Sequence, residues 1–68
     1  MRVVVNGDPR ELPDRATVAD AVAAAGAAPD GRGVAVAIDG EVVPRGRWEA
    51  TAVEAEQRIE VLQAVQGG

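Results

Sequence analysis

The glycines at positions 67 and 68 are the residues whose chemistry most directly suggests a reaction. The sequence contains no Ser, Cys, His, Lys or Tyr. These residue types supply most side-chain nucleophiles, general bases and soft metal ligands in proteins. Two threonines, seven arginines and scattered carboxylates remain. We therefore expect the α-carboxylate of Gly68 to be the reacting group, and we expect no metal site.

Two consecutive glycines suit a carboxylate that must enter the nucleotide site of another enzyme. Without Cβ atoms, Gly67 and Gly68 can pass through a narrow channel in extended or positive-φ conformations. A free carboxylate is a poor acyl donor, but its attack on the α-phosphate of ATP would give an acyl-adenylate from which AMP leaves readily. A persulfide could capture the acyl group and, after S–S cleavage, leave a thiocarboxylate. An amine could capture it instead, and the chain would then be a covalent modifier.

The composition limits the possible partners and compartments. The chain has 68 residues, 47% of them apolar, which is enough for one small domain. A net charge of −4 argues against a nucleic-acid partner, because phosphates demand a basic face. The acidic surface either complements a basic groove on a partner enzyme or is ordinary solvated surface. The absence of cysteine and of a long apolar segment predicts a cytoplasmic protein without a membrane partner.

The first third of the chain predicts a hairpin followed by a helix. Residues 2–6 form a β-branched run ending in Asn6-Gly7, which is typical of a two-residue type I′ turn. Residues 10–12 should return as a short strand that Pro9 interrupts. Thr17 fits the N-cap of a helix with Asp20 at the capping-box position, so capping explains it better than catalysis. Gly26 fits the position just after the helix.

The remainder predicts three further strands. Residues 34–39 are apolar and should lie inside the sheet, Asp39-Gly40 forms a second turn, and residues 41–43 return. Residues 45–51 should form a turn or short helical piece in which Trp48 covers a small core. In the last strand, residues 58–65, alternation places Leu62 and Ala64 on the face opposite Ile59 and Val61.

These elements predict an α+β domain in which one main helix packs across a mixed sheet of about five strands. This is the β-grasp arrangement of ubiquitin-like proteins, although periodicity alone does not define the strand order. Residues 1–65 should form the β-grasp domain, and residues 66–68 should form a flexible tail that ends in Gly-Gly.

The stretch Val42-Val43-Pro44-Arg45 is followed by Trp48, and it joins the two turns, the capped helix and the terminal Gly-Gly described above. With these residues the chain resembles, from end to end, the ThiS family, the sulfur carrier proteins of thiamine biosynthesis. The stretch from Val42 to Trp48 is the discriminating part, since other ubiquitin-like carriers share a terminal Gly-Gly. The chain departs from the family pattern at two places. Asp39 stands where the family often has Asn, and residues 55–57 replace the Gly-Asp that commonly precedes the last strand. The matching segments are Asn6-Gly7, Leu12-Pro13, residues 17–20, residues 34–37, residues 40–45, Trp48, residues 58–61 and residues 64–68.

The resemblance implies that the chain is a carrier, a co-substrate of other enzymes that binds no cofactor of its own. Its implied partners are a ThiF-like adenylating enzyme that uses ATP, a persulfide sulfur donor such as a cysteine desulfurase, and thiazole synthase. The alternatives are a carrier like the small subunit of molybdopterin synthase, a ubiquitin-like covalent modifier, and a plain interaction module. The stretch from Pro44 to Trp48 and the lack of aromatic residues near the tail argue against the molybdopterin alternative.

Site roles can be assigned along the last strand and the tail. Gly68 supplies the reacting carboxylate, Gly67 supplies clearance, and Gln66 and Val65 position the tail in a partner groove. The remaining candidates are docking residues. Leu62 and Ala64 would dock if exposed, whereas burial against the helix is their structural alternative. Arg45 either contacts a partner carboxylate or is an ordinary surface arginine.

Overall fold

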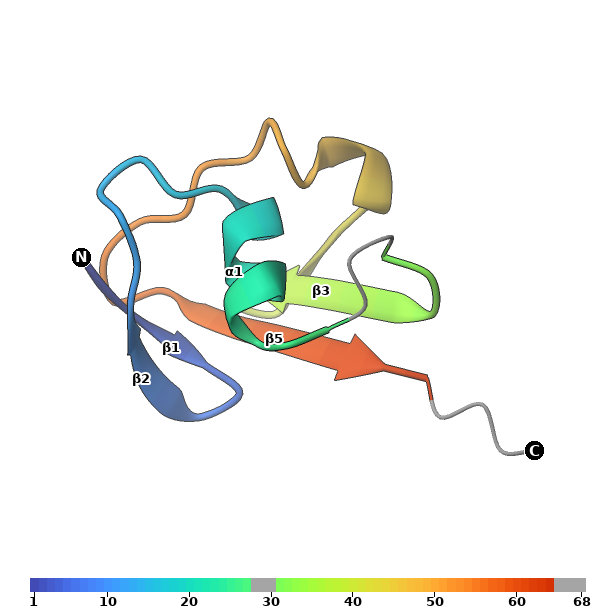
Figure 1. The fold of residues 1–68 in the computed structure, drawn as a ribbon, viewed down its shortest axis with the longest axis horizontal. Helices are drawn as coiled ribbons and strands as arrows, with labels where there is room; N and C mark the ends of the chain where they lie inside the picture. The colour runs from blue at the N-terminus through green and yellow to red at the C-terminus, as the bar shows by residue number, and fades with distance from the viewer. Residues whose placement is uncertain (28–30, 65–68) are drawn as a thin grey trace.

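In the computed structural model, which describes residues 1–27 and 31–64, five strands form one mixed sheet with a helix across it (Figure 1). The strand order is β2-β1-β5-β3-β4. β5 is central, parallel to β1 and antiparallel to β3. The predicted α+β β-grasp fold is therefore confirmed. The elements are β1 Arg2–Val5, β2 Asp8–Glu11, α1 Val18–Ala24, β3 Val34–Ile38, β4 Glu41–Val43, the 3₁₀ helix η1 Arg45–Arg47 and β5 Arg58–Gln63.

Both predicted two-residue turns are present. Asn6 and Gly7 have φ of 51° and 84°, and Asp39 and Gly40 have φ of 48° and 87°. Positive φ at both central positions is the type I′ geometry, which Asn, Asp and Gly tolerate best. The turns join β1 to β2 and β3 to β4, so each hairpin has the register that its turn predicts.

The second strand differs from the prediction, because β2 spans Asp8–Glu11 and runs through Pro9. Pro9 lies opposite Val4 in the β1–β2 pair. The Val4 N–H donates to the carbonyl of Gln57, at 2.9 Å, on the other side of β1. Pro9 therefore occupies a position that donates no ladder bond, on a strand at the sheet edge, where proline is tolerated.

The helix begins and ends where its caps predict. The Thr17 N–H donates to the Asp20 carboxylate at 2.8 Å, and the Asp20 N–H donates to Thr17 Oγ1 at 3.4 Å, which closes the capping box. Ala25 is the C-cap, and Gly26 follows with a φ of 75°. The buried stripe of α1 is Val18, Ala21 and Val22.

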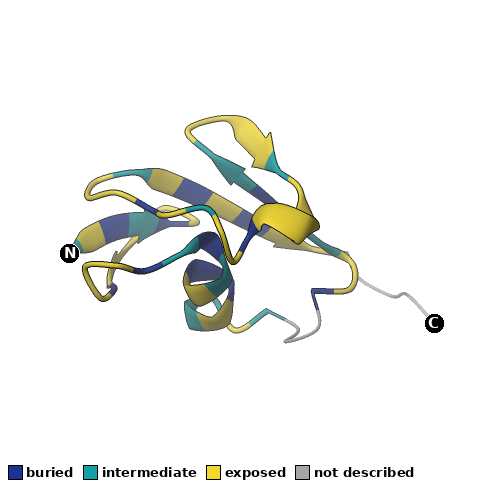
Figure 2. Ribbon diagram, turned by 90° about the horizontal axis from the view of Figure 1, so that it is seen from above, coloured by how far each residue is buried: buried dark blue, intermediate teal, exposed yellow. Residues whose placement is uncertain are grey.

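The core lies between the helix and the sheet. Buried residues alternate with more exposed ones along β1 and β5, whereas all four residues of the edge strand β2 are exposed (Figure 2). The largest fully buried side chains are Ile59, Val3, Val18 and Val36, which come from β5, β1, α1 and β3. Burial of such aliphatic side chains contributes about 1.5–3 kcal/mol each. Because β5 supplies the central strand, the core fixes the element that leads into the C-terminal segment.

The segment between β4 and β5 is held against the start of the helix. Trp48, the C-cap of η1, is only 7% exposed, and its indole N–H donates to the Val43 carbonyl at 2.9 Å. The Val18 N–H donates to the Thr51 carbonyl, and the Val53 N–H donates to the Ala16 carbonyl. The prediction that Trp48 covers the core is confirmed.

The turn before β5 uses a non-glycine residue in the left-handed region. Glu56 has a φ of 68°. Its N–H donates to the Arg2 carbonyl at 2.7 Å, and its carboxylate accepts from the Arg2 guanidinium at 3.0 Å. These bonds to β1 hold a conformation that glycine would adopt more readily.

Candidate functional site

The end of β5 determines where the C-terminal segment leaves the domain. The strand was predicted to run to Val65, but β5 ends at Gln63. One further bond joins the Ala64 N–H to the Gly33 carbonyl, at 2.7 Å. The predicted reacting and tail-positioning residues, Val65, Gln66, Gly67 and Gly68, lie outside the described residues, as do the predicted domain and tail boundaries at residues 65 and 66.

The alternation predicted along β5 is confirmed. Ile59 and Val61 are 1% and 7% exposed and face the helix, whereas Leu62 is 64% exposed. Ala64 is also exposed. The alternative in which Leu62 packs against the helix is therefore wrong, and the exposure that the docking prediction requires is present.

Leu62 belongs to an apolar strip on the face of the sheet that the helix does not cover. Leu62 pairs with Ala35, and Val42 pairs with Ala37, so all four side chains point to the same face. Val42 is 74% exposed. We call Leu62, Ala35, Ala37 and Val42 the outer sheet face. Val42 was missed in the sequence, although the Asp39-Gly40 turn fixes the register and period-two alternation then assigns its face.

Arg45 lies in a different place from the outer sheet face. It is exposed on η1, and with Trp48 and Gly31 it lines a hollow of about 410 Å³ beside the α1 residues Ala19 and Val22. An ideal Cβ on Gly31 would lie 3.0 Å from Arg45 Nε. The structure therefore brings Leu62 and Ala64 to the end of β5, but it separates Arg45 from the outer sheet face.

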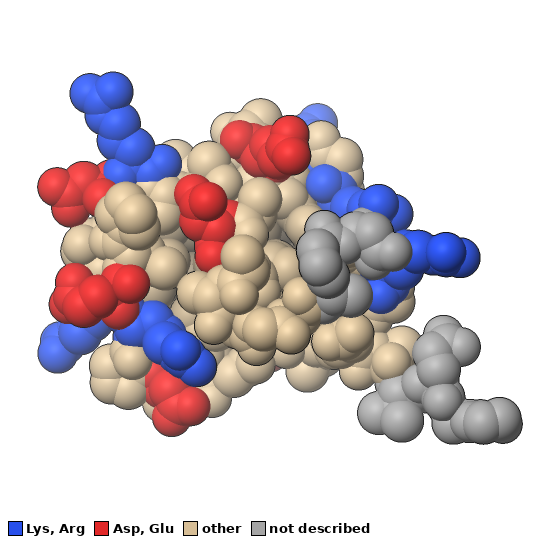
Figure 3. Space-filling view, in the orientation of Figure 1, with Lys and Arg blue, Asp and Glu red and all other residues tan. Residues whose placement is uncertain are grey.

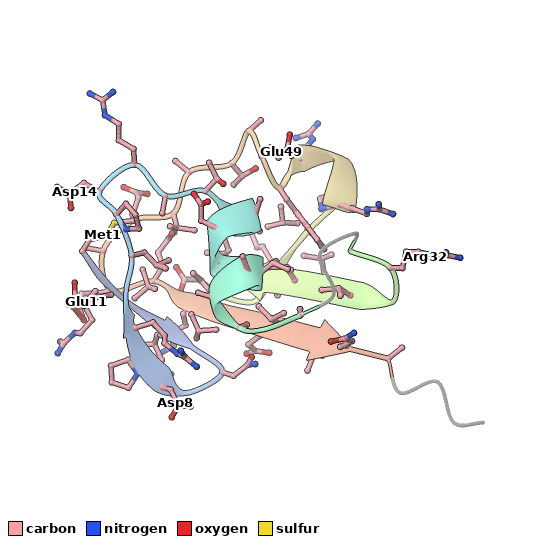
Figure 4. All side chains as sticks on the ribbon, viewed as in Figure 1. Met1, Asp8, Glu11, Asp14, Arg32 and Glu49 are labelled. Carbon is pink, nitrogen blue, oxygen red and sulfur yellow. The ribbon has the colours of Figure 1, made fainter. Side chains whose placement is uncertain are left out.

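Charge is distributed unevenly over the molecule. Glu11 and Asp14 lie near the Met1 amino group, whose distances to their carboxylates are 3.6 and 3.3 Å, whereas Arg32 lies at the opposite side, toward which β5 runs (Figure 4). In the view of Figure 3, basic side chains are found on both sides, whereas the acidic ones lie on the left and along the top. A chain of net charge −4 thus presents arginine near the end of β5.

The side chains of the described residues offer no catalytic constellation. The hydroxyl of Thr17 serves the capping box, and that of Thr51 donates to the Arg47 carbonyl at 2.7 Å. Residues 1–27 and 31–64 contain no group of three or more acidic, His or Cys side chains that could hold a metal. The hydrogen bond from Arg2, and then its positive charge, lower the pKa of Glu56, but this pair lies at the start of β5.

No helix in the described part of the chain is long and apolar enough to cross a membrane.

Comparisons with known proteins agree with this architecture. The family model of the ThiS family matches residues 3–68. The crystal structure of the thiamine biosynthesis protein (ThiS) from Geobacter metallireducens is 30% identical, with complete coverage of both chains and a TM-score of 0.78. The NMR solution structure of a thiamine biosynthesis protein from the same organism is also 30% identical, with a TM-score of 0.79 and coverage of all of this chain and 88% of the other. The comparison with curated protein sequences returns no match.

Proposed function

Because the chain belongs to the ThiS family, we propose that it is a sulfur carrier whose C-terminal glycine bears a thiocarboxylate that supplies sulfur for thiazole formation. The observation that carries the proposal is the family match, which extends through Gly67 and Gly68. The central strand β5 ends at Gln63, a few residues before them. The confirmed β-grasp fold and the lack of catalytic side chains in the described residues support a carrier rather than an enzyme.

The proposed loading takes place in three steps. The Gly68 carboxylate attacks the α-phosphate of ATP in the site of a ThiF-like adenylating enzyme, and pyrophosphate leaves. The terminal sulfur of a persulfide, supplied by a donor such as a cysteine desulfurase, then attacks the acyl carbon and displaces AMP. A thiol finally reduces the resulting acyl disulfide by two electrons. The transferred sulfur stays on the carrier as its thiocarboxylate. The cysteine sulfur of the donor forms a new disulfide with the reducing thiol.

The thiocarboxylate then acts as the sulfur nucleophile for thiazole synthase. ATP is bound and used by the adenylating enzyme, and the carrier itself needs no bound cofactor. We place these steps in the cytoplasm, where thiols remain reduced. Each partner must hold the carrier while the tail reaches its active site, so the carrier needs a docking surface.

The outer sheet face is the docking surface that we propose. Leu62 and Val42 are the only large hydrophobic side chains that are strongly exposed among the described residues. Ala35 and Ala37 lie between them on the same face. Exposed apolar side chains gathered on one face are typical of an interaction site. Ala64 extends this surface toward the tail, and Arg45 offers a separate contact to a partner carboxylate.

Reconstitution tests the proposal. The chain is incubated with ATP, a ThiF-like enzyme, a cysteine desulfurase, cysteine and a thiol, and its intact mass is measured. We expect replacement of one oxygen by sulfur, localised to Gly68 by fragmentation. A chain lacking Gly67 and Gly68 is the control, and it should give the same amide spectrum for residues 1–64 but no sulfur adduct. An unmodified wild-type chain, under conditions that load another ThiS protein, would contradict the proposal, and linkage to a lysine would identify a covalent modifier instead.

A further inference from the structure

Both hairpin turns send a side chain across to the central strand β5. The turn residues Asn6 and Asp39 are each followed by glycine and have nearly equal φ, 51° and 48°. Each accepts a hydrogen bond from a backbone N–H of β5, from Val61 to Asn6 and from Arg58 to Asp39. The two turns therefore hold the same strand at two places, Asp39 at its first residue and Asn6 three residues further toward the C-terminal segment.

Asn6 makes a reciprocal pair of hydrogen bonds with Val61. Its Oδ1 accepts from the Val61 N–H at 2.8 Å, and its Nδ2 donates to the Val61 carbonyl at 3.0 Å. The Asn6 backbone N–H also donates to the Ile59 carbonyl at 2.9 Å. The side-chain amide thus takes the place of a peptide group of a neighbouring strand.

This pairing occurs where β5 has lost its neighbour on one side. β1 ends at Val5, which pairs with Ile59, whereas β5 continues to Gln63. On the other side, β3 remains paired as far as Gln63, opposite Val34. Among the described residues, the bonds from Asn6 to Val61 are therefore the last hydrogen bonds on the β1 side of β5, and Val61 lies seven positions before Gly68 in the sequence.

We propose that Asn6 is a positioning residue for the loading reaction, one that fixes the end of β5 so that the tail enters the partner's active site in a defined direction. This inference rests on the proposed function. Leu62 and Gln63 are already paired with β3 alone, and without the side-chain amide of Asn6, Val61 would also be paired with β3 alone. The strand end would then open more often, and the carboxylate would reach the attacking position less often.

The matched variants are Asn6→Gly and Asp39→Gly. Each creates a Gly-Gly type I′ turn, which favours the same backbone conformation, and each removes the side chain that binds β5. The first releases the strand near the tail, and the second releases its start. Asn6→Asp is a second test, because it keeps an acceptor for the Val61 N–H but removes the donor to the Val61 carbonyl.

Amide hydrogen exchange measures the structural step without any sulfur chemistry. We expect Asn6→Gly to accelerate exchange at Val61 about tenfold, since two hydrogen bonds are lost there. Asp39→Gly should leave Val61 unchanged and accelerate exchange at Arg58. Unchanged exchange at Val61 in both Asn6→Gly and Asn6→Asp would overturn the inference.

Adenylation kinetics measure the functional step. With the carrier as the varied substrate of the adenylating enzyme, we expect Asn6→Gly to lower kcat about tenfold, because the carboxylate reaches the attacking position less often. The KM for the carrier should stay within about twofold, because the outer sheet face is intact. Asp39→Gly should retain kcat within about twofold of the wild type.

A merely structural role would instead change the stability of both variants and kcat of neither. If the wild type loads and both variants match it, the positioning role is refuted while the sulfur-carrier proposal stands; if the wild type does not load, that proposal fails and the positioning role fails with it.

Discussion

Replacement of Leu62 by alanine should separate docking from folding. Leu62 is 64% exposed on the outer sheet face. Its neighbour Gln63 is also exposed, but it pairs with Val34 and points to the opposite face of β5. Gln63→Ala is therefore a matched control that removes an uncharged side chain of similar length from the next position. If the outer sheet face docks to the adenylating enzyme, only Leu62→Ala should weaken the complex.

The magnitude follows from the exposed fraction of Leu62. Complete burial of a leucine side chain contributes about 1.5–3 kcal/mol. A partner that covers the exposed 64% would gain about 1–2 kcal/mol of this, which corresponds to a Kd about 5- to 30-fold weaker in the variant. The remaining buried fraction is worth only about 1 kcal/mol or less to folding. Leu62→Ala should thus reduce the binding free energy more than the free energy of unfolding.

Isothermal titration of the adenylating enzyme with each variant measures the Kd, and urea unfolding measures the stability. We expect Gln63→Ala to bind within about twofold of the wild type, as is usual for contacts outside the centre of an interface. Equal affinities for Leu62→Ala and the wild type would refute docking through the outer sheet face. Equal losses in both variants would show that the effect comes from the strand end rather than from this face.

The remaining predictions concern the fold. Thr17→Ala should lower the free energy of unfolding by about 1 kcal/mol, because it breaks the capping box, and an unchanged urea midpoint would contradict this. Gly31→Ala should lower the free energy of unfolding by about 1–3 kcal/mol, because Gly31 has a φ of 72° and the new Cβ would lie 2.8 Å from Trp48 Cζ3. Gly46→Ala, whose Cβ meets nothing within 4 Å, is the control, and Trp48 fluorescence reports unfolding. Arg2 lowers the pKa of Glu56 below its ordinary 4.5. The folded state therefore binds this proton less readily than the unfolded state, and the stabilisation is present above pH 4.5 and lost as the pH falls through the lowered value. As the pH falls, the free energy of unfolding should decrease less steeply for Glu56→Gln than for the wild type. Identical pH profiles for variant and wild type would argue against a stabilising Arg2–Glu56 pair.

Features set by local chemistry were predictable from the sequence. Asn6-Gly7 and Asp39-Gly40 form the expected turns because positive φ is a property of these residues themselves. The Thr17 capping box likewise depends on residues within one helical turn. The faces of β5 follow from alternation once the apolar residues Ile59 and Val61 are recognised as core.

Features that depend on distant partners were not predictable in this way. Pro9 lies within β2 because that strand is at the sheet edge, a property of the whole sheet. Periodicity did not define the strand order, because the order depends on pairs of strands that are distant in the sequence, such as β1 and β5. The Asn6 side chain bonds to Val61, which is 55 positions away in the sequence, so the turn motif alone gave no sign of it. The roles of Val65, Gln66, Gly67 and Gly68 stay predictions, since these residues lie outside the described part of the chain.

The most direct test of the sulfur-carrier proposal follows the sulfur atom itself. The chain is loaded with isotopically labelled sulfur from labelled cysteine, purified away from the donor, and mixed with thiazole synthase and its other substrates in a single turnover. The proposal predicts that the label moves from the Gly68 thiocarboxylate into the thiazole ring and that the carrier returns to the mass of the free carboxylate. Thiazole that forms without the label, or a carrier that keeps its labelled sulfur while thiazole accumulates, would contradict it.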